Sequence, residues 1–169
     1  TLPPLRPIIG SEPAWRYRNK LEYTFSAKRW LTADEIASGE TFAQQALGYH
    51  APGFFDRVLD IDTCYLQDER TDCIRNAVRA FAQAQGYPYY HIKTHEGLLR
   101  NLIIRCSVAT DEWMVILVLA QPEIAVVEAV FQHLRAACPF ITSYIWIHNP
   151  KKNDSYTDLT YNVWSGPEY

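Results

Sequence analysis

The sequence lacks the short motifs that mark the commonest catalytic and nucleotide-binding sites. Its 169 residues contain no GxGxxG, GxxxxGK[ST], GxSxG or HExxH pattern, which excludes the usual phosphate loops, serine nucleophile and zinc-protease helix. His91 and His95 are four residues apart, but they have no third ligand and lie where we expect a strand or loop. Asp60 and Asp62 lack a second group that would complete an acid–base pair. The chain alone is therefore not expected to be catalytic.

Long hydrophobic runs, paired cysteines and a positive net charge are also missing. The longest apolar run, Trp113–Ala120, is far shorter than the roughly 20 residues that span a bilayer, so no membrane partner is expected. Cys64, Cys73, Cys106 and Cys138 form no CxxC pair, which argues against a zinc ribbon or disulfide framework and favours a reduced, cytoplasmic protein. The net charge of −3 excludes a globally basic nucleic-acid binder but not a local basic patch.

The most informative segment that is present runs from Gly97 to Ala120. Two apolar, β-branched runs are joined by a short polar break and predict a β-hairpin. The second run is apolar throughout, as in a central strand with both faces covered. The first run contains Arg100, Asn101 and Arg105. Regular alternation places the two arginines on opposite faces of the sheet, unless a bulge or a twist intervenes.

A second basic segment, Arg16–Ser26, alternates between apolar and polar residues and predicts a half-buried strand. Arg16, Arg18 and Lys20 fall on its polar face. This face is either an ordinary solvated surface or a surface for nucleic acid, since Arg, Lys and Asn contact phosphates and base edges while neighbouring aromatic rings stack on unpaired bases.

The remaining patterns predict an α+β fold. Capping and turn signals delimit helices at 32–39, 68–85 and 121–138, and strands at 45–50, 58–63, 141–148 and 157–164. After an N-terminal hairpin, this order is that of a split βαβ, ferredoxin-like fold, with an antiparallel sheet and helices packed on one face. Residues 1–14 are rich in proline and predict a linker from a missing N-terminal region, and 15–169 form the domain.

Four segments of the sequence resemble those of one protein family. They are Tyr17–Ser26, Leu47–His50, Arg57–Cys64 and His95–Arg105, and they follow one another in this order. As a set they are similar to the central domain of the RNA (uracil-5-)-methyltransferases, in particular the 23S rRNA-type bacterial members. The similarity covers about 15–169.

The resemblance implies a parent enzyme longer than this chain. In that family a catalytic domain, here expected to follow residue 169, binds S-adenosylmethionine and supplies a cysteine nucleophile that attacks uracil. The chain lacks both motifs, so it is expected to be inactive alone and to have no cofactor of its own. Cys64 matches the family's fourth iron–sulfur ligand, and the three other ligands are absent here. A [4Fe–4S] cluster is thus implied only for the parent, and Cys64 is predicted to be a free thiol in this chain.

The implied function is to position substrate RNA, ribosomal RNA in particular, and the catalytic domain in cis. Its candidate RNA-binding residues are basic or amide side chains from the matching motifs and nearby: Arg18, Asn19, Lys20, Lys93, Arg100, Asn101 and Arg105. The same side chains would also suit contacts to the catalytic domain. A stand-alone RNA-binding module and a structural docking domain are the alternative interpretations.

Overall fold

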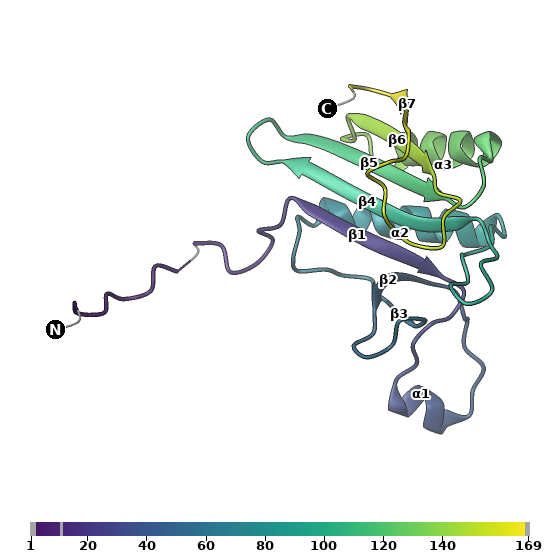
Figure 1. Ribbon diagram of the computed structural model, residues 1–169, viewed down its shortest axis with the longest axis horizontal. Helices are drawn as coiled ribbons and strands as arrows, with labels where there is room; N and C mark the ends of the chain where they lie inside the picture. The colour runs from purple at the N-terminus through teal and green to yellow at the C-terminus, as the bar shows by residue number, and fades with distance from the viewer. Residues whose placement is uncertain (1–2, 11, 168–169) are drawn as a thin grey trace.

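The computed structural model describes residues 3–10 and 12–167, and its organising element is one sheet of seven strands (Figure 1). The strands lie in the order β3-β2-β1-β4-β5-β6-β7. Their bounds are β1 Lys20–Ser26, β2 Ala46–His50, β3 Val58–Asp60, β4 Leu99–Ser107, β5 Glu112–Leu119, β6 Ser143–His148 and β7 Tyr161–Ser165. The predicted hairpin of Gly97–Ala120 is confirmed as β4 and β5, and β5 lies between two other strands, as its apolar sequence requires.

The prediction of an antiparallel, ferredoxin-like sheet is wrong. Helix α3 (Ile124–Ala137) leads from β5 to β6, which is the immediate parallel neighbour of β5, so no strand splits this βαβ unit. In addition, β1 pairs with both β2 and β4, which places the N-terminal strands inside the sheet and leaves β3 at its edge. The sheet is therefore mixed, because β5–β6 is parallel and its other named pairs are antiparallel.

The helices differ in how they are stabilised. The 15-residue helix α2 (Arg70–Ala84) and α3 lie side by side on one face of the sheet (Figure 1), as predicted for the helical layer. The short helix α1 (Ala33–Ser38) buries no residue and has the predicted capping box, in which the Glu35 amide donates to Thr32 Oγ1 and the Thr32 amide donates to the Glu35 carboxylate.

No helix in the described part of the chain combines the length and apolar character needed to cross a membrane.

Two apolar clusters, one on each face of the sheet, hold the domain together. The larger, helix-side cluster packs alternate residues of β1, β4 and β5, such as Leu102 and Leu117, against Val78 of α2 and Phe131 of α3. Burying one such side chain contributes about 2 kcal/mol. The smaller, loop-side cluster comprises Ile103, Ile116, Val118, Ile145, Ile147 and Tyr156. Its cover is the segment 149–160, which crosses the face opposite α2 and α3 (Figure 1).

Strand β1 is shorter than predicted but alternates as expected. Leu21, Tyr23 and Phe25 are buried in the helix-side cluster, so the intervening side chains point to the loop side. The strand begins at Lys20 rather than Arg16, because the Arg16 and Arg18 amides donate to the carbonyls of residues 65 and 66 instead. These two hydrogen bonds hold residues 16–18 beside the segment that leads into α2.

Candidate nucleic-acid interface

A β-bulge in β4 decides where its two arginines point. The pairing with β5 shifts between Leu99 and Asn101, so Asn101 lies opposite Val118 of the loop-side cluster. Five residues after Arg100, Arg105 pairs with Met114, which also packs against that cluster. The extra residue at the bulge cancels the odd spacing, and both arginines face the loop side. The prediction of opposite faces, which assumed regular alternation, is therefore corrected.

Arg100 is buried and fastens the turn at the start of segment 149–160. Its side chain is 3% exposed. Its guanidinium donates to the carbonyl oxygens of Asn149 (3.0 Å), Lys151 and Asn153 (3.1 Å) and to Asp154 Oδ1 (2.9 Å). The guanidinium carbon also lies 4.2 Å from the ring centroid of Tyr90. A buried guanidinium needs partners for most of its donors. Both terminal nitrogens of Arg100 are used in this way, and its buried Nε has no partner among the described residues. Arg100 therefore positions the turn.

Asn101 and Lys93 lie around the same half of the loop-side face. Asn101 is 2% exposed and lines a hollow of about 60 Å³ with Thr24 and His50. The Lys93 ammonium is 2.5 Å from an Asp56 carboxylate oxygen, and Asp56 lines the hollow too. The hydrogen bond from Lys93 holds the pKa of Asp56 below its ordinary value. A hollow of this size has room for ordered water but not for a nucleobase.

The other predicted residues meet at the opposite end of β4, and we call Arg18, Asn19, Lys20 and Arg105 the basic end. Lys20 and Arg105 are directly paired across β1 and β4, and the Cys106 amide donates to the Asn19 carbonyl oxygen at 2.9 Å. The residues of the basic end are exposed. Among residues 3–10 and 12–167, neither Arg18 nor Arg105 has an ion-pair partner. Their charges are available to an anionic ligand.

Exposed aromatic rings extend this surface. Trp15, Tyr17 and Tyr65 are 67%, 53% and 59% exposed. The ring centroids of Trp15 and Tyr65 are 5.9 Å apart, while the Arg16 guanidinium lies over Tyr65 and that of Arg18 over Tyr17. These contacts are spaced for edge-to-face and cation–π interactions. We call these five residues the aromatic–arginine cluster.

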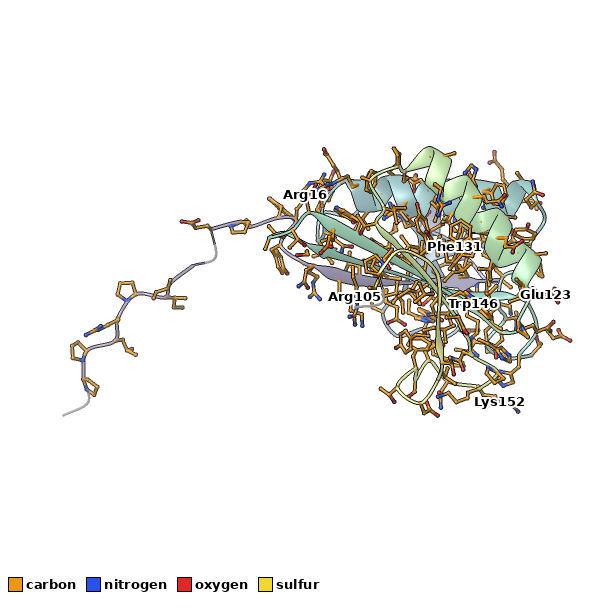
Figure 2. The ribbon with its side chains drawn as sticks, turned by 90° about the horizontal axis from the view of Figure 1, so that it is seen from above. Arg16, Arg105, Glu123, Phe131, Trp146 and Lys152 are labelled. Atoms are coloured by element: carbon orange, nitrogen blue, oxygen red, sulfur yellow. The ribbon has the colours of Figure 1, made fainter. Side chains whose placement is uncertain are left out.

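This surface and segment 149–160 lie at different ends of the molecule (Figure 2). Arg16 and Arg105 lie where the N-terminal segment leaves the sheet, whereas Lys152 and Glu123 lie at the other end. The alternating Trp15-Arg-Tyr-Arg18 sequence was a signal for the aromatic–arginine cluster that the sequence reasoning missed. No local pattern could reveal Tyr65, which is brought there by the hydrogen bond from the Arg16 amide to its carbonyl oxygen (2.7 Å).

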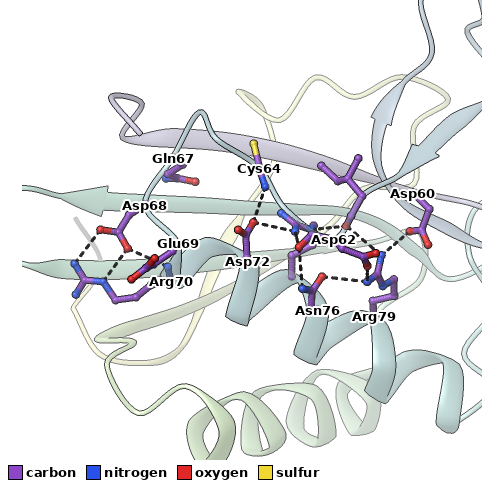
Figure 3. A network of polar contacts seen from close by, with 12 residues as sticks. Asp60, Asp62, Cys64, Gln67, Asp68, Glu69, Arg70, Asp72, Asn76 and Arg79 are labelled. Atoms are coloured by element: carbon purple, nitrogen blue, oxygen red, sulfur yellow. Dashed lines mark hydrogen bonds and ion pairs between the residues drawn. The ribbon is translucent and has the colours of Figure 1, made fainter. Parts of the chain in front are cut away.

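The acidic residues near α2 are used in a structural network (Figure 3). Arg79 pairs with both Asp60 and Asp62, and Arg70 pairs with Asp68. The hydrogen bond from Arg70 to Asp68 raises the pKa of Arg70, although burial opposes the rise. These carboxylates neutralise arginines at the start of α2, where Arg70 lies, and in its second half, where Arg79 lies.

Cys64 belongs to the same region and does not fit a metal cluster in this chain. Its side chain is 5% exposed within the helix-side cluster, its Sγ is 3.5 Å from the Tyr49 hydroxyl, and its amide donates to Asp72. No group of three or more His, Cys, Asp or Glu residues in the described part of the chain is arranged to hold a metal ion. The iron–sulfur role implied for Cys64 therefore finds no support.

Sequence comparison relates the chain to RNA methyltransferases. No family model matches it. It is 44% identical, over 99% of its length, to an uncharacterized RNA methyltransferase of Bacteroides thetaiotaomicron, and 39% identical, over 98%, to one of Porphyromonas gingivalis. The chain covers 38% and 37% of these relatives, so it corresponds to somewhat more than a third of each.

Structural comparison supports the fold. The chain is similar to part of the crystal structure of Pyrococcus abyssi tRNA (uracil-54, C5)-methyltransferase in complex with S-adenosyl-L-homocysteine. The TM-score is 0.65 at 20% identity, and the match covers 94% of this chain and 33% of the other. At this identity the match establishes a common fold.

Proposed function

We propose that this chain is the central region of an S-adenosylmethionine-dependent RNA (uracil-5-)-methyltransferase and helps to position its substrate RNA. The observation that carries this proposal is the 44% identity over 99% of the chain to part of an RNA methyltransferase. The motifs of the uracil-5 family and the fold it shares with a tRNA uracil methyltransferase support the finer assignment. Ribosomal RNA is the proposed substrate.

The chain contributes binding rather than chemistry in this proposal. S-adenosylmethionine would supply the methyl group from a catalytic domain elsewhere in the enzyme. The basic end offers exposed guanidinium groups for phosphates, and the aromatic–arginine cluster offers ring faces for unpaired bases. Arg100, Asn101 and Lys93 act indirectly, by shaping the face next to the contact surface.

The enzymatic part is tested on the product of the full-length gene. The protein is incubated with isotopically labelled S-adenosylmethionine and with unmodified ribosomal or transfer RNA, and the nucleosides are analysed by mass spectrometry. We expect labelled 5-methyluridine in ribosomal RNA. Label on another base would overturn the uracil-5 assignment, and label only in transfer RNA would overturn the ribosomal one. A full-length protein without methyl transfer to any RNA would reject the proposal as a whole.

The binding part is tested with Arg18→Gln and Arg105→Gln, each compared with Lys152→Gln. Lys152 is exposed like Arg105 but lies at the other end of the molecule (Figure 2). We expect each arginine variant to bind a single-stranded RNA more weakly and to lower the slope of log affinity against log salt by about 1. The Lys152 variant should bind like the unchanged chain. Equal effects of the three substitutions would mean that binding is diffuse and that the basic end is not the contact surface.

A docking role is the second candidate, because the edge strand β7 exposes apolar side chains. Tyr161 and Val163 are 42% and 40% exposed and lie on the same side of the strand. Trp146 and Trp164 are instead packed against the helix-side cluster. An edge of this kind suits contact with a following domain. Reduced thermal stability of the full-length protein with Tyr161→Ser and Val163→Ser, without a change in RNA binding, would favour docking at this edge.

A further inference from the structure

Two cysteines that are far apart in the sequence meet where α2 and α3 pack together. Cys73 is on the first turn of α2, and Cys138 is the residue that ends α3. Their sulfur atoms are 2.9 Å apart across 65 positions of sequence. Cys73 is exposed and Cys138 is buried. No sequence pattern distinguishes either cysteine from an ordinary structural residue.

We propose that Cys73 and Cys138 are a redox-active pair that forms a reversible disulfide joining α2 to the end of α3, with a small-molecule disulfide as the oxidant. The proposal goes beyond RNA binding and does not depend on it. A disulfide needs the two sulfur atoms about 2.05 Å apart, so closure from 2.9 Å requires a small movement.

Both thiols are held in place by their backbones. The Cys138 amide donates to the Leu134 carbonyl oxygen (2.8 Å), and its own carbonyl accepts from the Ile141 amide (3.2 Å). Cys73 lies within the helix, and its amide donates to the Glu69 carbonyl oxygen (3.4 Å). These backbone hydrogen bonds therefore hold Cys73 within α2 and Cys138 at the end of α3.

The exchange is balanced and its order follows from exposure. The exposed Cys73, as a thiolate, attacks a sulfur of the small disulfide, so that bond breaks and the first small thiol leaves and takes up a proton. The sulfur of Cys138 then loses its proton to water and attacks Cys73 Sγ, and the mixed disulfide releases the second small thiol. The two protein thiols lose two electrons in all, and one small disulfide is reduced. Burial and the hydrogen bond with Cys73 raise the pKa of Cys138 to about 12, so Cys73 is the site of first attack.

The other two cysteines serve as internal controls. Cys64 is buried and its sulfur lies beside the Tyr49 hydroxyl. Cys106 is half-buried, its sulfur lies 3.6 Å from Gln67 Nε2, and burial raises the pKa of its thiol. Neither has a sulfur neighbour among the residues described. Both should stay reduced when Cys73 and Cys138 are oxidised.

The test uses the folded chain and oxidised glutathione as the probe. After an acid quench, intact-mass and peptide mass spectrometry should find the loss of two hydrogens and a Cys73–Cys138 linked peptide, and dithiothreitol should restore the thiols. In Cys138→Ser we expect a stable glutathione adduct on Cys73, because the resolving thiol is missing. In Cys73→Ser we expect neither an adduct nor a disulfide.

Three results would overturn the proposal. One is an unchanged chain that stops at the glutathione adduct on Cys73, since the second thiol then does not resolve it. Another is a chain that stays fully reduced at a glutathione disulfide concentration that oxidises an exposed model dithiol. The last is a linked peptide that includes Cys64 or Cys106. Cys73→Ser replaces an exposed side chain, so circular dichroism of this variant separates loss of the site from loss of the fold.

Discussion

Arg100 and Arg105 lie on the same strand and the same face, yet they belong to two different regions. Around Arg100, the segment 149–160 covers the sheet and uses the guanidinium for four hydrogen bonds. Around Arg105 this cover is absent and the side chain is exposed beside Lys20. Residue type and strand position are therefore poor guides to a side chain's role, and the cover provided by a distant segment decides whether an arginine is an anchor or stays exposed.

The largest expected effect separates the two arginines by stability. Arg100→Met should lower the free energy of unfolding by about 3 kcal/mol, because it leaves buried carbonyl oxygens and the Asp154 carboxylate without their donor. The matched Arg105→Met should change it by less than about 0.5 kcal/mol, as is usual for exposed positions. Urea unfolding measures both. Similar losses in the two variants would abolish the distinction drawn between the regions.

A second prediction concerns ligand binding at the exposed region. Trp15→Ala and Tyr65→Ala should each weaken binding of single-stranded RNA by about 1–3 kcal/mol, the usual contribution of one stacked base. Phe54→Ala, at a ring that is 52% exposed elsewhere, is the control and should bind normally. Fluorescence anisotropy with labelled RNA gives the affinities. Weakening by Phe54→Ala as well would indicate a general effect of apolar surface.

A third prediction tests which contacts hold segment 149–160 against the sheet. The buried Tyr156 hydroxyl donates to Glu22 Oε1 at 2.9 Å, and burial, together with the negative charges of Asp154 and Glu22, raises the pKa of Tyr156. Tyr156→Phe should cost about 1 kcal/mol, since it removes this bond and keeps the ring. The exposed Tyr161→Phe should be neutral. A neutral result for Tyr156→Phe would show that the ring alone holds the segment.

The smallest effect is a pH dependence at the edge of the covered region. Because the hydrogen bond from Lys93 lowers the pKa of Asp56, this pair stabilises the fold at pH values above the ordinary aspartate pKa of about 3.9. The contribution is lost as the pH falls through the lowered pKa. Lys93→Met should therefore be slightly less stable than the unchanged chain at pH 7, and the difference should vanish at pH 2–3. A difference that grew towards acid pH would contradict the assignment.

Several elements could be read from the sequence because their causes are local. The capping box of Thr32 and Glu35, the hairpin of β4 and β5, and the alternation of Leu21, Tyr23 and Phe25 depend on neighbouring residues and periodicity. Part of the basic end could be predicted for the same reason, because Arg18, Asn19 and Lys20 are consecutive in the sequence.

The errors arose where pairing between distant segments decided the outcome. Alternation counts cannot include a bulge, so the shared face of Arg100 and Arg105 was missed. Periodicity does not specify which strands become neighbours, so an antiparallel sheet of split βαβ order was predicted, whereas β5 and β6 are adjacent and parallel. Tyr65 and the Cys73–Cys138 contact likewise join segments that no local pattern connects.

The sequence by itself determined the types and most of the order of the elements, the apolar character of β5, and the presence of basic and aromatic residues near the start of β1. These follow from side-chain chemistry and spacing within a few residues. Only the tertiary structure decided which charges stay exposed. Segment 149–160 had to close over one half of the loop-side face, and burial there required Arg100 to give its donors to backbone oxygens. Arg105, beyond this cover, stays exposed.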